Sequence, residues 1–243
     1  MKTIIVTGAS GGIGRAVAER FLDAGWTVGL IARRADLLNA IAAGRSAMPL
    51  PCDVTQADEV DHAFDAFANE VGRLDVLFNN AGIFVPPAMI DEMPLADWHQ
   101  AVAVNLTGMF LSARAAFRLM RRQAPQGGRI INNGSISAHA PRPGSVGYTV
   151  TKHAITGLTK VLALDGRPFG IACGQIDIGN AETELSATLG QGARQADGTV
   201  RAEPLMDVAH VADAVLQMAS LPAEANVLSM TIMATTMPFV GRG

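Results

Sequence analysis

Residues 3–14, TIIVTGASGGIG, place an apolar, β-branched run directly before a glycine-rich turn. The apolar run has the composition of a buried strand. After the turn, Ile13, Val17 and Phe21 recur every fourth residue, which is the spacing of one buried face of a helix. A strand, a glycine turn and an amphipathic helix in this order predict the first unit of a parallel α/β sheet.

The same alternation of short apolar runs and segments of helical period continues along the chain. We expect strands at Thr3–Val6, Thr27–Ile31, Ala47–Cys52, Val76–Asn79, Arg129–Asn132, Gly170–Ile176 and Val227–Met233. We expect helices at Leu95–Arg122, Val146–Leu164 and Val208–Ser220. The predicted fold is a single α/β domain over residues 1–243, with a doubly wound parallel sheet of about seven strands flanked by helices.

Two segments carry further local signals. Residues 55–58, TQAD, have the form of a capping box with Asp at the acidic position, which predicts that a helix begins there. Residues 190–198, GQGARQADG, are glycine-rich and polar, and they interrupt the alternation. Long loops in compact α/β domains often cover a site, so we expect a substrate lid over about residues 179–205. An exposed loop without a function is the alternative.

Composition excludes several classes of protein. Hydrophobic residues make up 49% of the 243 residues and charged residues 17%, which is too apolar for a disordered chain. The net charge of −3 argues against a nucleic-acid or anionic-membrane surface. The two cysteines lie far apart without metal-ligand spacing, so we expect neither a disulfide scaffold nor a metal site. We expect a soluble cytoplasmic protein without a signal peptide or membrane span.

The glycine turn predicts a phosphate site. Glycine lets the backbone turn tightly and approach a pyrophosphate, while the amides and dipole of a helix N-terminus attract the anion. The pattern is GxxxGxG rather than GxGxxG, and a purely structural turn is the alternative. We expect the residues that contact a dinucleotide here to be Gly8, Ser10, Gly12, Ile13 and Gly14.

The end of the second predicted strand indicates which dinucleotide is bound. An acidic residue there would hold the ribose hydroxyl of NAD, whereas arginine accommodates the 2′-phosphate of NADP. The chain has Arg33 and Arg34 at this place and no carboxylate in the turn. We therefore expect NADP (NADPH), with NAD less favoured, and a solvated basic turn as the alternative.

One pair of residues indicates acid–base chemistry. Tyr148 is the only tyrosine of the chain, and Lys152, one of three lysines, lies four residues later on a predicted helix. The two side chains therefore share a helical face. A tyrosine has an ordinary pKa of about 10, and a neighbouring cation favours its ionised form.

The chain resembles the short-chain dehydrogenase/reductase family over nearly its whole length, which implies a Rossmann-type fold. Matching motifs occur in the order of the family: Thr7-Gly8-xxx-Gly12-x-Gly14, Asp53-Val54, Asn79-Asn80-Ala81-Gly82, Asn105, Ser135 and Tyr148-xxx-Lys152. The resemblance implies that Tyr148 exchanges a proton with the substrate oxygen and that Ser135 orients this oxygen. Lys152 is expected to lower the pKa of Tyr148 and to hold the nicotinamide ribose.

The resemblance also implies roles outside these three residues. Asn105 is expected to lie at a kink in its helix that holds a water for proton relay, with simple packing as the alternative. Asp53 is expected to reach the adenine, and Asn79 with Gly82 to line the adenosine side. The remaining residues expected to contact the cofactor are Val54, Ala81, Gly179, Ala181 and Thr183.

The chain departs from the family pattern at two places. Ile178 stands where the family has proline, and Asp177 is an additional carboxylate that we interpret as a structural anchor. Gly134 stands where the family often has a second serine. Neither departure removes a proton-transfer group.

Three functions are compatible with these residues. The first is an NADP-dependent oxidoreductase that interconverts a carbonyl compound and a secondary alcohol. The second is a 3-oxoacyl thioester reductase that meets an acidic carrier protein through four arginines on one helix, which are Arg114, Arg118, Arg121 and Arg122. The third is a dinucleotide-binding regulatory module without catalysis.

The loop after Ser135 carries His139 and Arg142, either of which could select the small-molecule substrate, although loop polarity explains both equally well. The family resemblance further implies a homo-oligomer, either a dimer or a tetramer.

Overall fold

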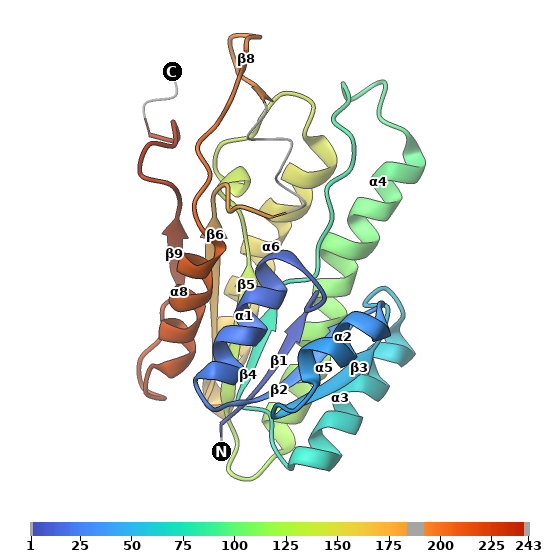
Figure 1. Ribbon diagram of the computed structural model, residues 1–243, viewed down its shortest axis with the longest axis vertical. Coiled ribbons are helices and arrows are strands. Elements are labelled where there is room, and N and C mark those ends of the chain that lie inside the picture. The colour runs from blue at the N-terminus through green and yellow to red at the C-terminus, as the bar shows by residue number, and fades with distance from the viewer. Residues whose placement is uncertain (1, 184–191, 241–243) are drawn as a thin grey trace.

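The computed structural model describes residues 2–183 and 192–240. Seven strands form one parallel sheet in the order β3-β2-β1-β4-β5-β6-β9, with helices on both faces (Figure 1). The strands are β1 (Thr3–Thr7), β2 (Thr27–Ala32), β3 (Ala47–Pro51), β4 (Val76–Asn79), β5 (Gly128–Asn133), β6 (Ile171–Ile178) and β9 (Ser229–Ile232). The principal helices are α1 (Gly12–Asp23), α2 (Ala35–Ala42), α3 (Ala57–Val71), α4 (Leu95–Val102), α5 (Met109–Arg122), α6 (Val146–Asp165) and α8 (Val208–Ser220).

The strand order creates the position of the site. The chain first moves outward from β1 to β3 and then returns to β4 on the other side of β1. In a doubly wound sheet, the crevice at the carboxyl ends of the strands next to this reversal binds ligands. All seven predicted strands are present, and the doubly wound architecture is confirmed.

Each face of the sheet has its own apolar core. Ile4 and Val6 pack with α1, α2 and α8, whereas Ile5 packs with α3 and α5 on the opposite face. Successive side chains of a strand point to opposite faces, so a sheet covered on both sides needs an uninterrupted apolar run. This explains why residues 4–6 are apolar without alternation.

The helices differ from the predictions in three places. The predicted helix start is confirmed, because α3 begins at Ala57, but the predicted capping contact of Thr55 is wrong. Thr55 instead donates its backbone N–H and its hydroxyl to Asp53 Oδ1, at 3.0 and 2.8 Å. Asp53 competes locally for the hydroxyl that would have capped the helix. The short helix α2 had escaped prediction. The predicted helix Leu95–Arg122 contains a π-helical segment, Ala103–Gly108, between α4 and α5.

The predicted lid lies partly outside the described residues, because residues 184–191 are not among them. The described part after this gap forms a two-stranded antiparallel hairpin of β7 (Ala193–Arg194) and β8 (Val200–Arg201). Within residues 2–183 and 192–240, no helix combines the length and the apolar character needed to cross a membrane.

Candidate active site

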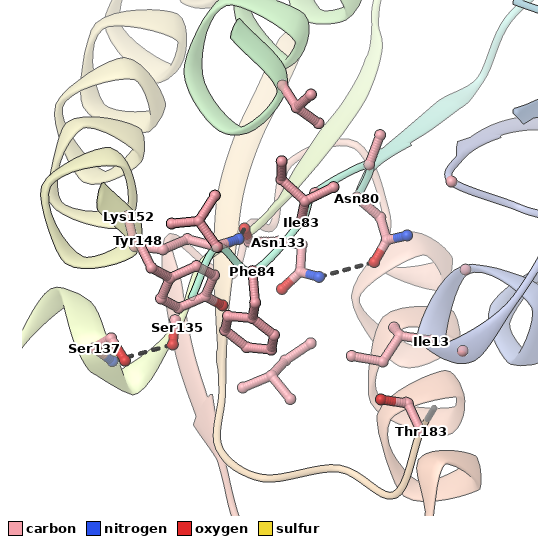
Figure 2. Close-up of a pocket in the computed structure, with 18 of the residues that line it drawn as sticks. Ile13, Asn80, Ile83, Phe84, Asn133, Ser135, Ser137, Tyr148, Lys152 and Thr183 are labelled. Carbon is pink, nitrogen blue, oxygen red and sulfur yellow. Dashed lines mark hydrogen bonds between the residues drawn. The ribbon is translucent and has the colours of Figure 1, made fainter. Parts of the chain in front are cut away.

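A cleft of about 980 Å³ opens at the carboxyl ends of the strands and is lined from both halves of the sheet (Figure 2). Most of the predicted site residues line it. They are Gly8, Ser10, Gly12, Ile13, Gly14, Arg33, Arg34, Asp53, Val54, Ala81, Gly82, Ser135, Tyr148, Lys152, Gly179, Ala181 and Thr183. Asn79 and Asn105 do not line it.

The turn between β1 and α1 forms one end of the cleft, and its glycines are required there. Gly8 has a φ of 71° and Gly12 a φ of 50°, values that favour glycine. A Cβ on Gly14 would come closer than 3.0 Å to the carbonyl oxygen of Gly8. Among the described residues, no side chain caps the N-terminus of α1, so its first amides remain available to an anion.

Two exposed arginines border the same end. Arg34 donates from Nη2 to the hydroxyl of Ser10 at 3.1 Å and lies against Gly11. Arg33 also lines the cleft. Their guanidinium groups give this end a positive charge next to the glycine turn.

Asn79 does not line the cleft, contrary to the prediction from the sequence. Its side chain is buried and donates to the carbonyl oxygen of Met109 at 2.8 Å and to Asn132 at 3.0 Å. The prediction that Asn79 lines the cofactor is therefore wrong. The next residue, Asn80, lines the cleft and accepts a hydrogen bond from Asn133 at 2.8 Å (Figure 2). Because neighbouring residues of an extended chain point to opposite sides, only one of the two adjacent asparagines could face the cleft. The sequence does not show which of the two it is.

Asn105 is fully buried in the π-helical segment rather than exposed in the cleft. Its side chain accepts from the backbone N–H of Ile83 at 2.8 Å and donates to the carbonyl oxygen of the same residue at 2.9 Å. Ile83 itself lines the cleft. The expected irregularity of the helix is present, and the Asn105 side chain connects it to the wall of the cleft.

Tyr148 and Ser135 meet at the other end of the cleft. Tyr148 lies in the first turn of α6, and its ring packs at 4.4 Å from that of Phe84, which sequence reasoning had missed (Figure 2). Burial raises the pKa of Tyr148 to about 12, while a hydrogen bond from Ser135 and the charge of Arg142 act in the opposite direction. The Ser135 hydroxyl also accepts from the backbone N–H of Ser137 at 3.1 Å.

Lys152 is buried one helical turn after Tyr148. Its ammonium group lies 5.5 Å from the centre of the Tyr148 ring and donates to the carbonyl oxygen of Asn133 at 2.7 Å. Burial lowers the pKa of Lys152 to about 8, and the charge of Asp177 partly opposes this effect. Ser135 and Arg142 act to lower the pKa of Tyr148, and the expected lowering by Lys152 stays a prediction.

A charge cluster with a buried carboxylate borders the cleft. Arg142 donates to Asn180 at 3.2 Å and forms an ion pair with Glu203, a residue that no sequence signal had indicated. Burial favours a higher pKa for Glu203, but hydrogen bonds from Gln195, Arg142 and Asn180 outweigh it and hold the pKa below its ordinary value. In the described ranges, no group of three or more His, Cys, Asp or Glu side chains could hold a metal ion.

Comparison with known proteins places this geometry in a family. A family model described as short chain dehydrogenase matches residues 2–194. A 3beta-hydroxysteroid dehydrogenase of Mediterraneibacter gnavus is 36% identical over 190 residues, which cover 76% of this chain and 68% of the relative. Sulfoacetaldehyde reductase 2 of Chromohalobacter salexigens is 31% identical and covers 96% of this chain and 94% of the relative.

The solved structures agree with these relatives. A 3-ketoacyl-(acyl-carrier-protein) reductase from Brucella melitensis, complexed with NADH, superposes with a TM-score of 0.85. It is 25% identical, and the superposition covers 96% of each chain. The glycine turn, the paired tyrosine and lysine, the sheet topology and these relatives together show that this chain is an oxidoreductase of the short-chain dehydrogenase/reductase family.

Proposed function

We propose that this protein is an NADP-dependent oxidoreductase that interconverts a carbonyl compound and a secondary alcohol. The observation that carries the proposal is the meeting of Tyr148 and Ser135 at one end of a cleft whose other end is a glycine turn. The first end offers a proton next to a second hydroxyl, and the other offers amides to a phosphate.

The residues at the glycine end fit a dinucleotide. The absent side chain of Gly14 leaves the turn close to β1, and the uncapped start of α1 offers its amides to the pyrophosphate. Arg33 and Arg34 would bind the 2′-phosphate, and Thr183, close to Gly12, would reach the nicotinamide side. When bound, NADPH would donate the hydride during reduction and NADP would accept it during oxidation. Side chains of the protein would transfer the proton and orient the substrate.

Proton transfer falls to Tyr148. With a pKa of about 12, its hydroxyl is protonated at neutral pH and suited to donate to a carbonyl oxygen during reduction. The hydroxyl of Ser135 accepts from the backbone of Ser137, and its proton, which acts on Tyr148 in this structure, would turn to the substrate oxygen when the substrate binds. Lys152, one turn away, is placed to contact the nicotinamide ribose.

Arg142 is the residue of the loop after Ser135 that we propose selects the substrate. It lines the cleft, and its Nε is buried without a hydrogen-bond partner among the described residues. Buried donors are rarely left unpaired, so we propose that a second oxygen of the substrate accepts from it. The other candidate, His139, instead contacts Asp177.

Reduction of a carrier-bound 3-oxoacyl thioester is the alternative within the family, and the arginines do not favour it. Arg114 and Arg118 form ion pairs with Asp61 and Asp65 of α3. Arg121 lies over the ring of Phe169. These contacts occupy part of the positive charge that an acidic carrier protein would need.

The proposal is tested first by binding and then by turnover. NADPH and NADH are titrated against the wild type, and a panel of ketones, aldehydes and acetoacetyl thioesters is screened with the tighter cofactor. We expect tighter binding of NADPH and turnover of small carbonyl compounds. Tight binding without turnover on any carbonyl or alcohol would support the regulatory module instead, and equal binding of NADH would remove the NADP assignment.

A further inference from the structure

The two departures from the family pattern, at Gly134 and at Asp177, meet in the structure. Gly134 directly follows β5, and its backbone N–H donates to the carbonyl oxygen of Ile176 at 2.9 Å. A Cβ on Gly134 would come closer than 3.0 Å to the carboxylate of Asp177 and to the amide of Gln175. Because the φ of Gly134 is not in the left-handed region, the requirement for glycine comes from space alone. The Asp177 carboxylate therefore occupies the volume that a side chain at position 134 would need.

The same carboxylate holds the backbone at Ser135. Asp177 is fully buried, and its Oδ1 accepts from the backbone N–H of Ser135 at 2.9 Å and from Gln175 Nε2 at 2.6 Å. Its Oδ2 lies 2.8 Å from Nε2 of His139, whose side chain is 46% exposed. Donors thus reach both oxygens of the buried carboxylate, as a buried charge requires.

Ser135 connects the Asp177 carboxylate to Tyr148, the proposed proton donor. The Ser135 side chain acts to lower the pKa of Tyr148, so the backbone that Asp177 holds also carries a group that acts on the proposed proton donor. A displacement of about 1 Å at such a group can cost two orders of magnitude in rate. The charged and titratable groups that act around the carboxylate are His139, Lys152 and Tyr148.

We propose that Asp177 is a positioning residue, which holds the backbone of Ser135 so that its hydroxyl stays beside Tyr148. Gly134 is part of the same device, because its missing side chain leaves the space for the carboxylate. The catalytic importance of this device rests on the proposed function. The negative charge of Asp177 also contributes to the raised pKa of Tyr148.

The first test is Asp177→Asn, which keeps the size of the side chain and removes its charge. We expect kcat for carbonyl reduction to fall about tenfold or more, with the affinity for NADPH unchanged. Tyr148 is the only tyrosine of the chain, so the near-ultraviolet absorbance of its phenolate reports its ionisation without cofactor or substrate. The midpoint of this titration is expected at lower pH in the variant.

A matched control is Asp165→Asn, the same change at an exposed residue near the end of α6, roughly 25 Å from Tyr148 along the helix. It is expected to leave kcat and the titration unchanged. Because an asparagine Oδ1 can still accept from the backbone of Ser135, Asp177→Ala is measured beside Asp177→Asn. If Asp177→Ala leaves kcat at its wild-type value, the positioning role is overturned.

A second set of variants tests the shared volume even if Asp177→Asn fails to fold. Gly134→Ala is expected to lower the urea midpoint strongly, and Gly134→Ala/Asp177→Ala to recover much of that loss while kcat stays low. A Gly134→Ala variant as stable as the wild type would contradict the proposal. If the wild type reduces no carbonyl compound, the proposed function fails, whereas the urea and phenolate measurements still decide the role of Asp177.

Discussion

The two ends of the cleft are built in different ways. At the proposed cofactor end, backbone atoms and small residues of one short segment within residues 8–14 line the cleft, with Arg33 and Arg34 at its border. At the proposed substrate end, residues that line the cleft are held by distant segments: Arg142 contacts Glu203, 61 residues later, and Ser135 contacts Asp177, 42 residues later. A backbone site is tolerant of most side-chain changes but intolerant of added volume. A side-chain site is sensitive to the charge and shape of single residues.

A substitution of Tyr148 is expected to separate the two ends most strongly, because it should lower kcat and leave the affinity for NADPH unchanged. Tyr148→Phe keeps the ring that packs on Phe84 and removes only the hydroxyl. We expect kcat to fall about 10³-fold, because the proton donor is lost, while the dissociation constant for NADPH stays within twofold, roughly the scatter of such a measurement. Single-turnover kinetics with NADPH and a fluorescence titration measure the two quantities. Activity within tenfold of the wild type would show that another group transfers the proton.

At the cofactor end, the strongest effect is expected from added volume. Gly14→Ala places a methyl group against the Gly8 carbonyl oxygen and the Asn80 amide. We expect a loss of about 3 kcal/mol in the free energy of unfolding, measured in urea, together with weaker NADPH binding. The matched control is Gly157→Ala in α6, where the added Cβ meets no described atom within 4 Å apart from its chain neighbours and the backbone of its own helix, and where we expect no loss. Similar stability of the two variants would contradict the close packing of the turn.

At Lys152, activity and stability are expected to respond in opposite directions to a substitution. Burial lowers its pKa to about 8 from 10.5, so between these pH values the unfolded chain binds a proton that the folded chain does not. The free energy of unfolding should therefore rise with pH across this window, and the full cost of burying the ammonium group is present below about pH 8.

Lys152→Met removes this cost and a hydrogen bond to Asn133, so we expect a net gain of about 1–2 kcal/mol at pH 7. The gain should shrink as the pH approaches 10.5, and kcat should fall. Urea unfolding at several pH values measures the gain, with Lys160→Met, an exposed lysine of the same helix, as the control. A pH-independent loss of stability would contradict the buried charge.

The smallest effect is expected at the exposed arginines. Arg33→Ala and Arg34→Ala should each weaken NADPH binding about tenfold and leave NADH binding unchanged, because only the 2′-phosphate is lost as a partner. Arg122→Ala, an exposed arginine in the last turn of α5, is the control. Equal losses for both cofactors would mean that the arginines act on a part that the two share.

Prediction from the sequence was most successful where residues act through their neighbours along the chain. The seven strands, the glycine turn and the shared face of Tyr148 and Lys152 follow from local composition and spacing. The predictions failed where a distant or competing hydrogen-bond partner decides the direction in which a side chain points. Asn79 turned inward to Asn132, and Thr55 was engaged by Asp53 instead of capping a helix.

The sequence by itself determined the alternation of strands and helices, the glycine turn after β1 and the shared helical face of Tyr148 and Lys152, because periodicity and motif spacing act over a few residues. Only the tertiary structure decided that the Asp177 carboxylate occupies the space beside Gly134, and that Glu203 holds Arg142 at the cleft. The physical reason is that these contacts join the segment between β5 and α6 to β6 and to the segment before α8. Their distances arise from sheet register and packing, which a linear spacing does not encode.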